Sequence, residues 1–530
     1  MNEQLVLYNI KDALGHVEPD PTIYQDRLEA FNIIVLRTAQ DSMYRTQLGD
    51  DSDIWLLMKE ILSYCNFSNV KKFSQETVYW YKRTVKAIFV FARNLSVANA
   101  LIPQELLIQN TAYKVFNSSL SIGNVNDDIE ISLYSSILSF LHNINVNSVI
   151  FDKSTKDELF QFLSYPSLIN YQYDENMMFP YILYFKDLLE NDEFLYYFLR
   201  SEQKDEILYD FLMKKIMQDE SQLFNIMKGV DLAYEDKELS SVDIILFKCF
   251  SKIAAHESFA TYLEIIENTS FEKFLNILKT MQLVVTNIDN WNKFELTGIM
   301  TWTFRVFNQT ADKIIHYFEL KMEDDSEAHI LHSKMITVLD ILSKLSQYEH
   351  VQKFVLFYKG LEKLVTLLQT FQDNLIRVNF SKTAGGNVSA VKASNKLGEK
   401  LESENLIQSR IDSSKFKIKE TNFPECKLLI IEIIANLVHG NKEVQDKIRD
   451  LQGLGLVLSN CVIDDNDPFI KERSIMCIKF LLENNPENQQ YVAQLESKRA
   501  ANDQVLQEAG YEVNIDSSGN LKLKSTSVEN

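Results

Sequence analysis

A sixteen-residue stretch near the end of the chain recurs with a shift of 44 residues, and this recurrence limits the possible folds more than any other feature. "IIANLVHGNKEVQDKI", which ends at Ile448, aligns with "CIKFLLENNPENQQYV", which ends at Val492. The alignment places Leu437 on Leu481, Asn441 on Asn485 and Gln445 on Gln489. Each copy has apolar residues at helical spacing, a short break of Asn, Gly or Pro, and a second helical stretch. The pattern predicts a chain built from repeated pairs of helices.

The period itself points to a class of fold, because armadillo and HEAT arrays repeat every ~40–47 residues. The chain of 530 residues has 14 Gly and 8 Pro but is 46% hydrophobic, so helix breakers are scarce and core material is plentiful. Each repeat can bury its apolar face only against its neighbours. We therefore predict an all-α fold, an armadillo/HEAT-like right-handed α-solenoid by analogy with known arrays, with a long disordered insertion and a small C-terminal β-hairpin.

Related units occur further upstream. "VQKFVLFYKGLEKLV" from Val351 resembles "VQDKIRDLQGLGLVL" from Val444 and pairs Gly360 with Gly453, but the shift of 93 residues is too long for one period. The segment between them is polar and Ser/Lys-rich, which favours a loop inserted within a repeat. "AIFVFARNLSVANALI" and "SILSFLHNINVNSVIF" also align, with Phe91 on Phe140 and Asn94 on Asn143. We expect the two Phe residues in the core and each Asn to close a helix end by bonding to backbone.

These observations predict four regions. They are an armadillo-like helical repeat region at 1–370, a flexible polar insertion within a repeat at 371–422, C-terminal helical repeats at 423–510, and a hairpin with a tail at 511–530. The hairpin is expected because "YEVNIDSSGNLKLK" alternates apolar and polar residues on both sides of a Ser-Ser-Gly turn. Two strands alone are marginal, so we expect the hairpin to dock on the last helices.

Charge and apolar runs exclude several classes of function. The formal net charge of −20 repels phosphate backbones, so we expect no nucleic-acid partner. No apolar run approaches the ~20 residues of a membrane span, and the first residues lack the layout of a signal peptide. Five widely spaced cysteines fit buried free thiols in a reducing compartment rather than a disulfide framework. We expect a cytoplasmic protein.

The acidic turn "IDDNDPF" between the two C-terminal copies invites a calcium site. An EF-hand frame that starts at Asp464 fails, because Pro468 falls where an oxygen ligand is required and neither the Gly nor the final Glu is present. Asp467 followed by Pro468 instead has the form of an N-cap and a first helical residue. We expect Asn485 and Pro486 to begin the next helix in the same way.

The sequence gives little support for a metal site or a catalytic site. Copper handling needs paired Cys or a Met-x-x-Met ladder, which the chain lacks, and lone thiols such as Cys461 and Cys477 are expected to be buried. The best metal candidate groups His329 and His332 with Glu323, Asp324 and Asp325, but an ordinary charged helix surface is the preferred interpretation. The P-loop, Rossmann, nucleophile-elbow and HExxH motifs are all absent, so we predict no enzyme, no cofactor and no metal or catalytic site residues.

The C-terminal residues carry a family resemblance. The run from Leu428 to Glu496, with Asn436-Leu437, Gln445-Asp446 and Pro468-Phe469-Ile470, resembles the C-terminal domain of the ataxin-10 family, and "QEAGYEVNIDSSGNLKLK" resembles the tail of that family. The resemblance implies a cytoplasmic armadillo-like protein without catalysis, linked to cytokinesis and to the binding of protein partners. Fungal relatives are also sometimes named as copper-transport proteins.

We therefore expect a non-enzymatic armadillo-repeat scaffold or adaptor that binds protein partners of unknown identity, with a role in the regulation of cytokinesis. A copper-handling accessory protein and an importin-like peptide-binding adaptor are the alternatives, although Trp80 and Trp302 lack the Asn four residues later that an importin-like ladder needs. Homo-oligomerisation stays open. The insertion from Ser381 to Glu420 has eight Lys/Arg and five Asp/Glu, so phosphorylation of its Ser and Thr residues would reverse its charge.

Overall fold

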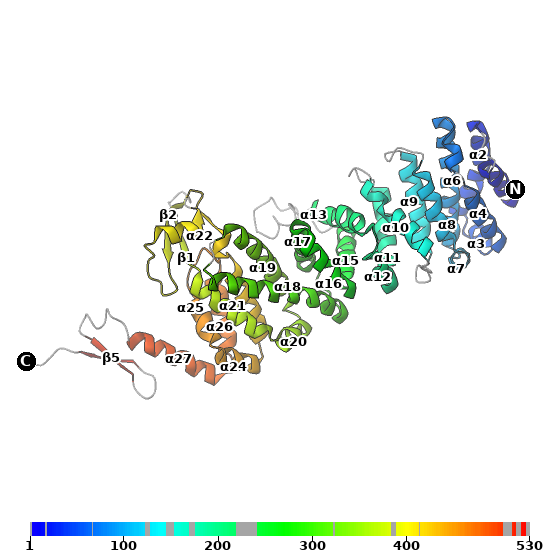
Figure 1. Cartoon of the computed structure of the whole chain (residues 1–530). Coiled ribbons are helices and arrows are strands. Elements are labelled where there is room, and N and C mark those ends of the chain that lie inside the picture. Colours follow the sequence, from blue (N-terminus) through cyan, green and yellow to red (C-terminus); the bar gives the residue numbers. More distant parts are fainter. Residues whose placement is uncertain are drawn as a thin grey trace, which may run out of the picture. The chain divides into compact units, whose positions relative to one another are not determined.

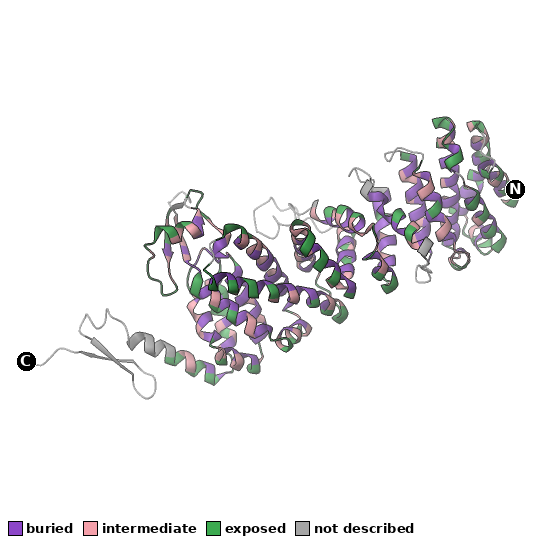
Figure 2. Cartoon of the chain, viewed as in Figure 1, coloured by how far each residue is buried: buried purple, intermediate pink, exposed green. Residues whose placement is uncertain are grey.

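The computed structural model describes residues 3–501, apart from 16–18, 66, 122–127, 145–152, 169–174, 219–240, 322–323, 383–387 and 413, together with 511–515 and 521–525. The chain divides into two compact units, Met1–Lys273 and Phe274–Asn530. Helices dominate both units (Figure 1), which confirms the expected all-helical repeat fold. Buried residues lie on the faces where helices meet, and exposed residues lie on the outer faces (Figure 2).

The first unit is a stack of helices. They are α1 (Glu3–Gly15), α2 (Pro21–Gln40), α3 (Ser42–Gly49), α4 (Ser52–Tyr64), α5 (Phe67–Val70), α6 (Gln75–Ser96), α7 (Leu101–Glu105), α8 (Ile108–Ser119), α9 (Asp128–Asn143), α10 (Lys153–Leu168), α11 (Glu175–Leu189), α12 (Asp192–Phe198), the π-helix η2 (Glu206–Met213), α13 (Lys214–Gln218), α15 (Ser241–Ala255) and α16 (Glu257–Thr269), followed by α17 (Phe271–Asn287) at the boundary. Within the stack, α2, α6, α9, α11 and α15 pack side by side in this order.

Local sequence explains where the long helices of this stack begin. Asp20 precedes Pro21 and accepts a hydrogen bond from the backbone N–H of Thr22, and Ser74 accepts one from Thr77 at the start of α6. Aromatic side chains then fill the space between neighbouring helices. The rings of Phe31 and Phe91, for example, meet edge to face with centroids 5.3 Å apart.

The second unit contains the two copies of the 44-residue repeat. Its elements are α18 (Lys293–Glu319), α19 (Asp325–Leu345), α20 (Glu349–Phe357), α21 (Gly360–Asn374), β1 (Arg377–Lys382), β2 (Val388–Ser394), α22 (Glu404–Arg410), β3 (Ile411–Asp412), β4 (Lys417–Ile418), the 3₁₀ helix η3 (Glu420–Asn422), α23 (Cys426–Val438), α24 (Lys442–Asp450), α25 (Gly453–Ser459), α26 (Ile470–Leu482), α27 (Pro486–Ala501), β5 (Tyr511–Ile515) and β6 (Leu521–Ser525). One row of packed helices runs α18, α21 and α25, and a second row runs α19, α23 and α26.

The aligned copies occupy equivalent places in this unit. Leu437 in α23 and Leu481 in α26 are both buried. Gly360 and Gly453 each begin a helix directly after a residue in the left-handed conformation, Lys359 or Gln452. A Cβ on Gly360 would lie 2.6 Å from Cγ1 of Val355, so a side chain there would collide with the preceding helix. The paired glycines therefore allow the close approach of two short helices in each repeat.

The segment expected to be a flexible insertion is folded over most of its described length, so this expectation is wrong. Its first residues, 371–374, belong to α21, and β1 and β2 form an antiparallel pair in which Val378 faces Ala393. Ile376, Val378, Ala393 and Ile411 form a small buried cluster of their own. The residues of this cluster come from apolar positions that alternate with polar ones along the strands. The many Ser and Lys residues around them make this alternation difficult to recognise in the sequence. Residues 383–387 and 413 lie outside the described residues.

The C-terminal hairpin is confirmed. β5 and β6 pair antiparallel, with Tyr511 opposite Ser525 and Ile515 opposite Leu521. The docking of the hairpin on the last helices stays a prediction. The rest of the expected tail, 516–520 and 526–530, and the end of the expected repeat region, 502–510, lie outside the described residues.

Candidate functional site

Asparagine side chains connect successive helices of the stack. Nδ2 of Asn94 in α6 donates to the backbone oxygen of Val35, 3.3 Å away, and to the hydroxyl of Thr38, 3.2 Å away, both near the end of α2. The amide therefore bonds to the preceding repeat. The expected bond to a backbone carbonyl is therefore present, but it reaches the preceding helix. Phe91 and Phe140 are fully buried, as predicted.

The same contact recurs twice. Nδ2 of Asn143 in α9 donates to the backbone oxygen of Arg93 and the hydroxyl of Ser96, at 3.1 and 3.2 Å. In the second unit, Nδ2 of Asn436 in α23 donates to the backbone oxygen of Ser343 and the hydroxyl of Ser346, at 3.3 and 2.8 Å. We call these three contacts the asparagine ladder. Its members use both amide hydrogens within the protein, so these groups are not free to bind a peptide backbone.

Sequence reasoning missed Asn436 and the hydroxyl partners. The signal was a Ser or Thr three residues after the carbonyl that accepts the other bond, as in Val35 and Thr38. Such a hydroxyl is too common in any sequence to be recognised without knowing which helices are neighbours.

The ladder fixes the orientation of α6 and thereby of its exposed stripe. Tyr79, Arg83, Lys86, Val90 and Arg93 recur every three or four residues, and all are exposed or only partly buried. Tyr81, Ile88 and Phe91 point the other way into the core. α6 therefore presents three cationic side chains on one face.

These three cations lie close enough to influence one another. Nη1 of Arg83 donates to the hydroxyl of Tyr79 at 2.9 Å, and its guanidinium lies 5.0 Å from the ring centroid of Trp80. Nη2 of Arg93 donates to Oδ1 of Asn94 at 3.1 Å. Partial burial, with the positive charges of Arg83 and Arg93, lowers the pKa of Lys86. Among the described residues, none of the three cations forms an ion pair with a carboxylate.

The neighbouring helix α9 continues this face with neutral groups. Ser132, Ser135 and Ser139 are partly buried at the corresponding spacing, and the hydroxyl of Ser139 donates to the backbone oxygen of Ser135. His142 follows, and its Nδ1 lies 2.6 Å from Oδ2 of Asp187 in α11. This contact engages the Asp187 carboxylate. We call the exposed stripe of α6 together with these serines the α6–α9 face.

The acidic turn before α26 has a structural role that the sequence did not reveal. Asp467 is fully buried, and α26 begins only at Ile470, with Phe469 in the N-cap position. The prediction that Asp467 caps this helix is therefore wrong. Nζ of Lys427 lies 2.9 Å from Oδ2 of Asp464 and 3.2 Å from Oδ2 of Asp467. Burial opposes the charge of Lys427, but the two carboxylates outweigh it and raise its pKa; burial raises the pKa of Asp467.

The same turn holds the folded insertion against the repeats. The backbone N–H of Val378 donates to Oδ1 of Asp464 at 3.0 Å, and that of Phe380 donates to Oδ2 of Asp465 at 2.6 Å. Nδ2 of Asn422 donates to Oδ1 of Asn466 at 2.7 Å. A buried network of this kind needs partners for every polar group, which explains the density of Asp and Asn here.

The second predicted helix start is confirmed. The backbone N–H of Asn488 donates to Oδ1 of Asn485 at 3.1 Å, and Pro486 is the first residue of α27. Asn441 accepts the corresponding bond from Val444 at the start of α24. The two aligned Asn residues therefore perform the same capping function.

The metal candidates do not come together. Nε2 of His332 donates to the backbone oxygen of Pro424 at 3.0 Å, and burial lowers the pKa of this imidazole. Oδ1 of Asp324 caps α19, and Glu323 lies outside the described residues. No group of three or more His, Cys, Asp or Glu side chains in the described part of the chain is placed to hold a metal ion.

The cysteines are free thiols. Cys249, Cys426 and Cys477 are buried, whereas Cys65 and Cys461 are partly exposed. Burial raises the pKa of Cys249 to about 12 and raises the pKa of Cys426 well above its usual value. These two thiols therefore stay protonated at neutral pH, which is the unreactive form. The burial of Cys249, Cys426 and Cys477 confirms the prediction for these three thiols, whereas the partial exposure of Cys65 and Cys461 shows that it is wrong for the other two.

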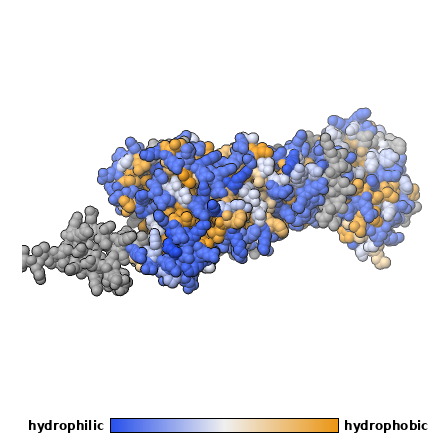
Figure 3. Space-filling model, turned by 60° about the horizontal axis from the view of Figure 1, so that its bottom comes forward, coloured by the Kyte–Doolittle hydropathy of each residue, from blue (hydrophilic) through white to orange (hydrophobic). Residues whose placement is uncertain are grey.

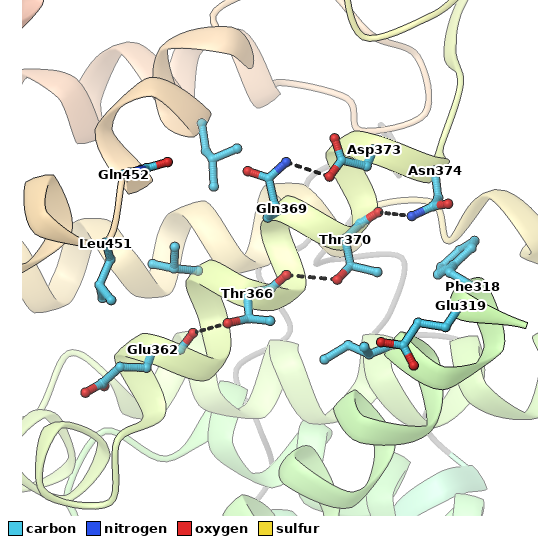
Figure 4. Close-up of a pocket in the computed structure, with 13 residues that line it drawn as sticks. Phe318, Glu319, Glu362, Thr366, Gln369, Thr370, Asp373, Asn374, Leu451 and Gln452 are labelled. Carbon is cyan, nitrogen blue, oxygen red and sulfur yellow. Dashed lines mark hydrogen bonds between the residues drawn. The ribbon is translucent and has the colours of Figure 1, made fainter.

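A pocket of about 500 Å³ lies in the second unit between α18, α21 and the loop before α25 (Figure 4). Its polar side chains bond within the protein. Nε2 of Gln369 donates to Oδ2 of Asp373 at 2.7 Å, and the hydroxyl of Thr370 donates to the backbone oxygen of Thr366 at 3.0 Å. Glu362 forms an ion pair with Lys447 at 2.7 Å. These pairs engage polar groups of the pocket with neighbouring residues of the protein.

The face of the molecule in Figure 3 is largely hydrophilic where it is coloured, with separate hydrophobic areas. In the part of the chain that the structure describes, no helix combines the length and the apolar character needed to span a membrane.

Comparison with known proteins assigns the chain to a family. The family described as "Spinocerebellar ataxia type 10 protein domain" matches residues 426–524. The Ataxin-10 homolog of Candida glabrata is 54% identical over 98% of this chain and 98% of its own length. The chain belongs to the ataxin-10 family. The Ataxin-10 homolog of Saccharomyces cerevisiae is 38% identical over 99% of this chain and 96% of its own length.

Among solved structures, the crystal structure of importin beta in an ammonium sulfate condition is similar to this chain. The match covers 96% of this chain and 70% of the importin beta chain, with 10% sequence identity and a TM-score of 0.19. A likeness at this score does not bear on the function of this ataxin-10 family member.

Proposed function

We propose that this ataxin-10 family member is a non-enzymatic helical-repeat scaffold that binds protein partners and takes part in the regulation of cytokinesis in the cytoplasm. The observation that carries the scaffold role is the asparagine ladder, because it holds neighbouring helices in a fixed orientation and so keeps a continuous side-chain surface in place. Extended surfaces of stacked repeats serve as binding surfaces in solenoid proteins generally.

The role in cytokinesis rests on the family to which the chain belongs. Two other functions are less well supported. An importin-like adaptor would need asparagine amides free to hold a peptide, and the amides of Asn94, Asn143 and Asn436 are engaged within the protein. A copper-handling protein would need clustered soft ligands, and His332 is bonded to a backbone carbonyl instead.

The scaffold role is tested by deleting the protein in its host and by purifying the intact chain from synchronised cells. We expect deletion to delay cell separation, and we expect the chain purified during cytokinesis to retain a reproducible set of proteins that is absent from cells arrested in interphase. Normal division together with the absence of any reproducible partner would overturn the proposal.

A further inference from the structure

We propose that the α6–α9 face binds an acidic, extended segment of a protein partner. This inference rests on the scaffold role proposed above and adds the chemistry of the partner. Its starting point is the uncompensated charge of Arg83, Lys86 and Arg93, none of which has a carboxylate partner among the described residues.

The cluster is electrostatically unfavourable while the face is empty. The chain as a whole has a net charge of −20, so acidic residues that could neutralise these cations are plentiful, yet none in the described part of the chain forms an ion pair with them. Burial and the two arginines lower the pKa of Lys86, which means that its positive charge is disfavoured where it stands. A carboxylate placed between the three cations would remove this repulsion.

Arg83 is already held in place. The hydroxyl of Tyr79 accepts one N–H of Arg83, and the ring of Trp80 lies 5.0 Å from its guanidinium. Because the guanidinium has five N–H donors, several are left to engage a carboxylate, and little side-chain entropy is lost on binding. Such an orientation favours recognition of a planar carboxylate.

The spacing of the cations sets the shape of the ligand. With a rise of ~1.5 Å per residue, Arg83 and Lys86 are ~4.5 Å apart along the axis of α6, and Lys86 and Arg93 are ~10.5 Å apart. An extended chain advances ~3.3 Å per residue, so about five residues cover the whole cluster. Ser132 and Ser139 of α9 border this track with neutral hydroxyl groups, which do not repel an anionic chain.

The test uses the intact chain and a fluorescein-labelled decaglutamate peptide, followed by fluorescence anisotropy at low and physiological salt. We expect saturable binding that weakens as salt rises, because exposed charges are screened over ~8–10 Å under these conditions. A decaglutamine peptide is the uncharged control and should not bind.

The decisive variant is Arg83→Glu with Lys86→Glu, which should weaken decaglutamate binding at least ~tenfold, or ~1.4 kcal/mol. The matched control is Lys313→Glu with Lys479→Glu, which makes the same change in net charge at exposed helical positions of the second unit and should leave binding nearly unchanged. Circular dichroism compares the folding of all variants. Arg83→Gln with Lys86→Gln, which adds no negative charge, should weaken binding to a smaller extent and serves if the reversal variant does not fold.

Equal loss in the control and the face variant would mean that only net charge matters and would overturn the inference. The inference would also be overturned if the chain bound anionic phosphatidylserine vesicles through Arg83 and Lys86 but did not bind decaglutamate. If the face variant still retains the partners of the wild-type chain and neither protein binds decaglutamate, the partner chemistry is wrong while the scaffold role stands. If the wild-type chain retains no partner at all, the scaffold role itself fails.

Discussion

Nζ of Lys427 lies 2.9 Å from Oδ2 of Asp464, and both side chains are at least 97% buried. The lysine is at the start of α23, and the aspartate is in the turn that precedes α26. Because Asp464 also accepts the backbone N–H of Val378, this contact joins two successive repeats and the folded insertion. A buried charge of this kind is stable only while its partners are in place.

Replacement of Lys427 by Met leaves Asp464 and Asp467 buried beside each other without a cation. We expect a loss of about 3–5 kcal/mol in the free energy of unfolding, measured by urea denaturation. Lys442→Met is the control, because Lys442 forms ion pairs with Asp446 and Glu487 at the surface, where such pairs contribute about 0–1 kcal/mol. Equal effects of the two replacements would contradict the buried network.

Gln445 and Gln489, which the repeat alignment pairs, should differ in their contribution to stability. Nε2 of Gln445 donates to the backbone oxygens of Val438 and Phe480, so this buried amide bridges two repeats. Gln445→Ala removes it and should cost about 1–3 kcal/mol. Gln489 makes an exposed bond to Leu482, and Gln489→Ala should stay within about 0.5 kcal/mol of the wild type. Thermal and urea denaturation of the two variants would show whether the position of the glutamine within the array decides the loss of stability.

Leu437 and Leu481 are equivalent core positions of neighbouring repeats. Truncation of either to Ala should cost about 2–5 kcal/mol and should weaken the neighbouring repeat as well, because solenoid stability depends on the interfaces between repeats. Ile475→Ala, at a side chain that is 51% exposed, serves as the control and should change stability little. Unchanged unfolding of both leucine variants would show that the 44-residue alignment does not describe the packing.

Asp446 makes the stability of the C-terminal repeats depend on acid pH. Hydrogen bonds from Asn485 and Lys442 lower the pKa of Asp446 from 3.8 to about 2. Since the folded-state pKa lies below the unfolded value, the stabilisation is complete above pH ~4 and is lost as the pH falls toward about 2. In Asp446→Asn, we expect a smaller loss of stability over this interval than in the wild type. Asp450→Asn, at an exposed neighbouring carboxylate, should follow the wild-type curve.

Several features of this protein could be predicted from the sequence because they depend on neighbouring residues. The period of 44 residues, the caps at Asn441 and Asn485 and the burial of Leu437 and Leu481 follow from helical spacing and from breaks between helices. The hairpin at 511–525 follows from alternation about a turn. In each case, the pattern that predicts the structure is formed by residues close to one another in the sequence.

The tertiary structure decided the rest. Asp467 has the sequence context of a helix cap, but it forms a buried ion pair with Lys427, which is 40 residues away in the sequence. Val378 lies in a segment that looked disordered, and its backbone is held by Asp464, 86 residues further on. The asparagine ladder and the unpaired cations of α6 are likewise defined by which helices become neighbours. A local pattern records propensity and periodicity, whereas the partner of a buried polar group is set by contacts between distant segments, and these contacts exist only once the repeats have stacked.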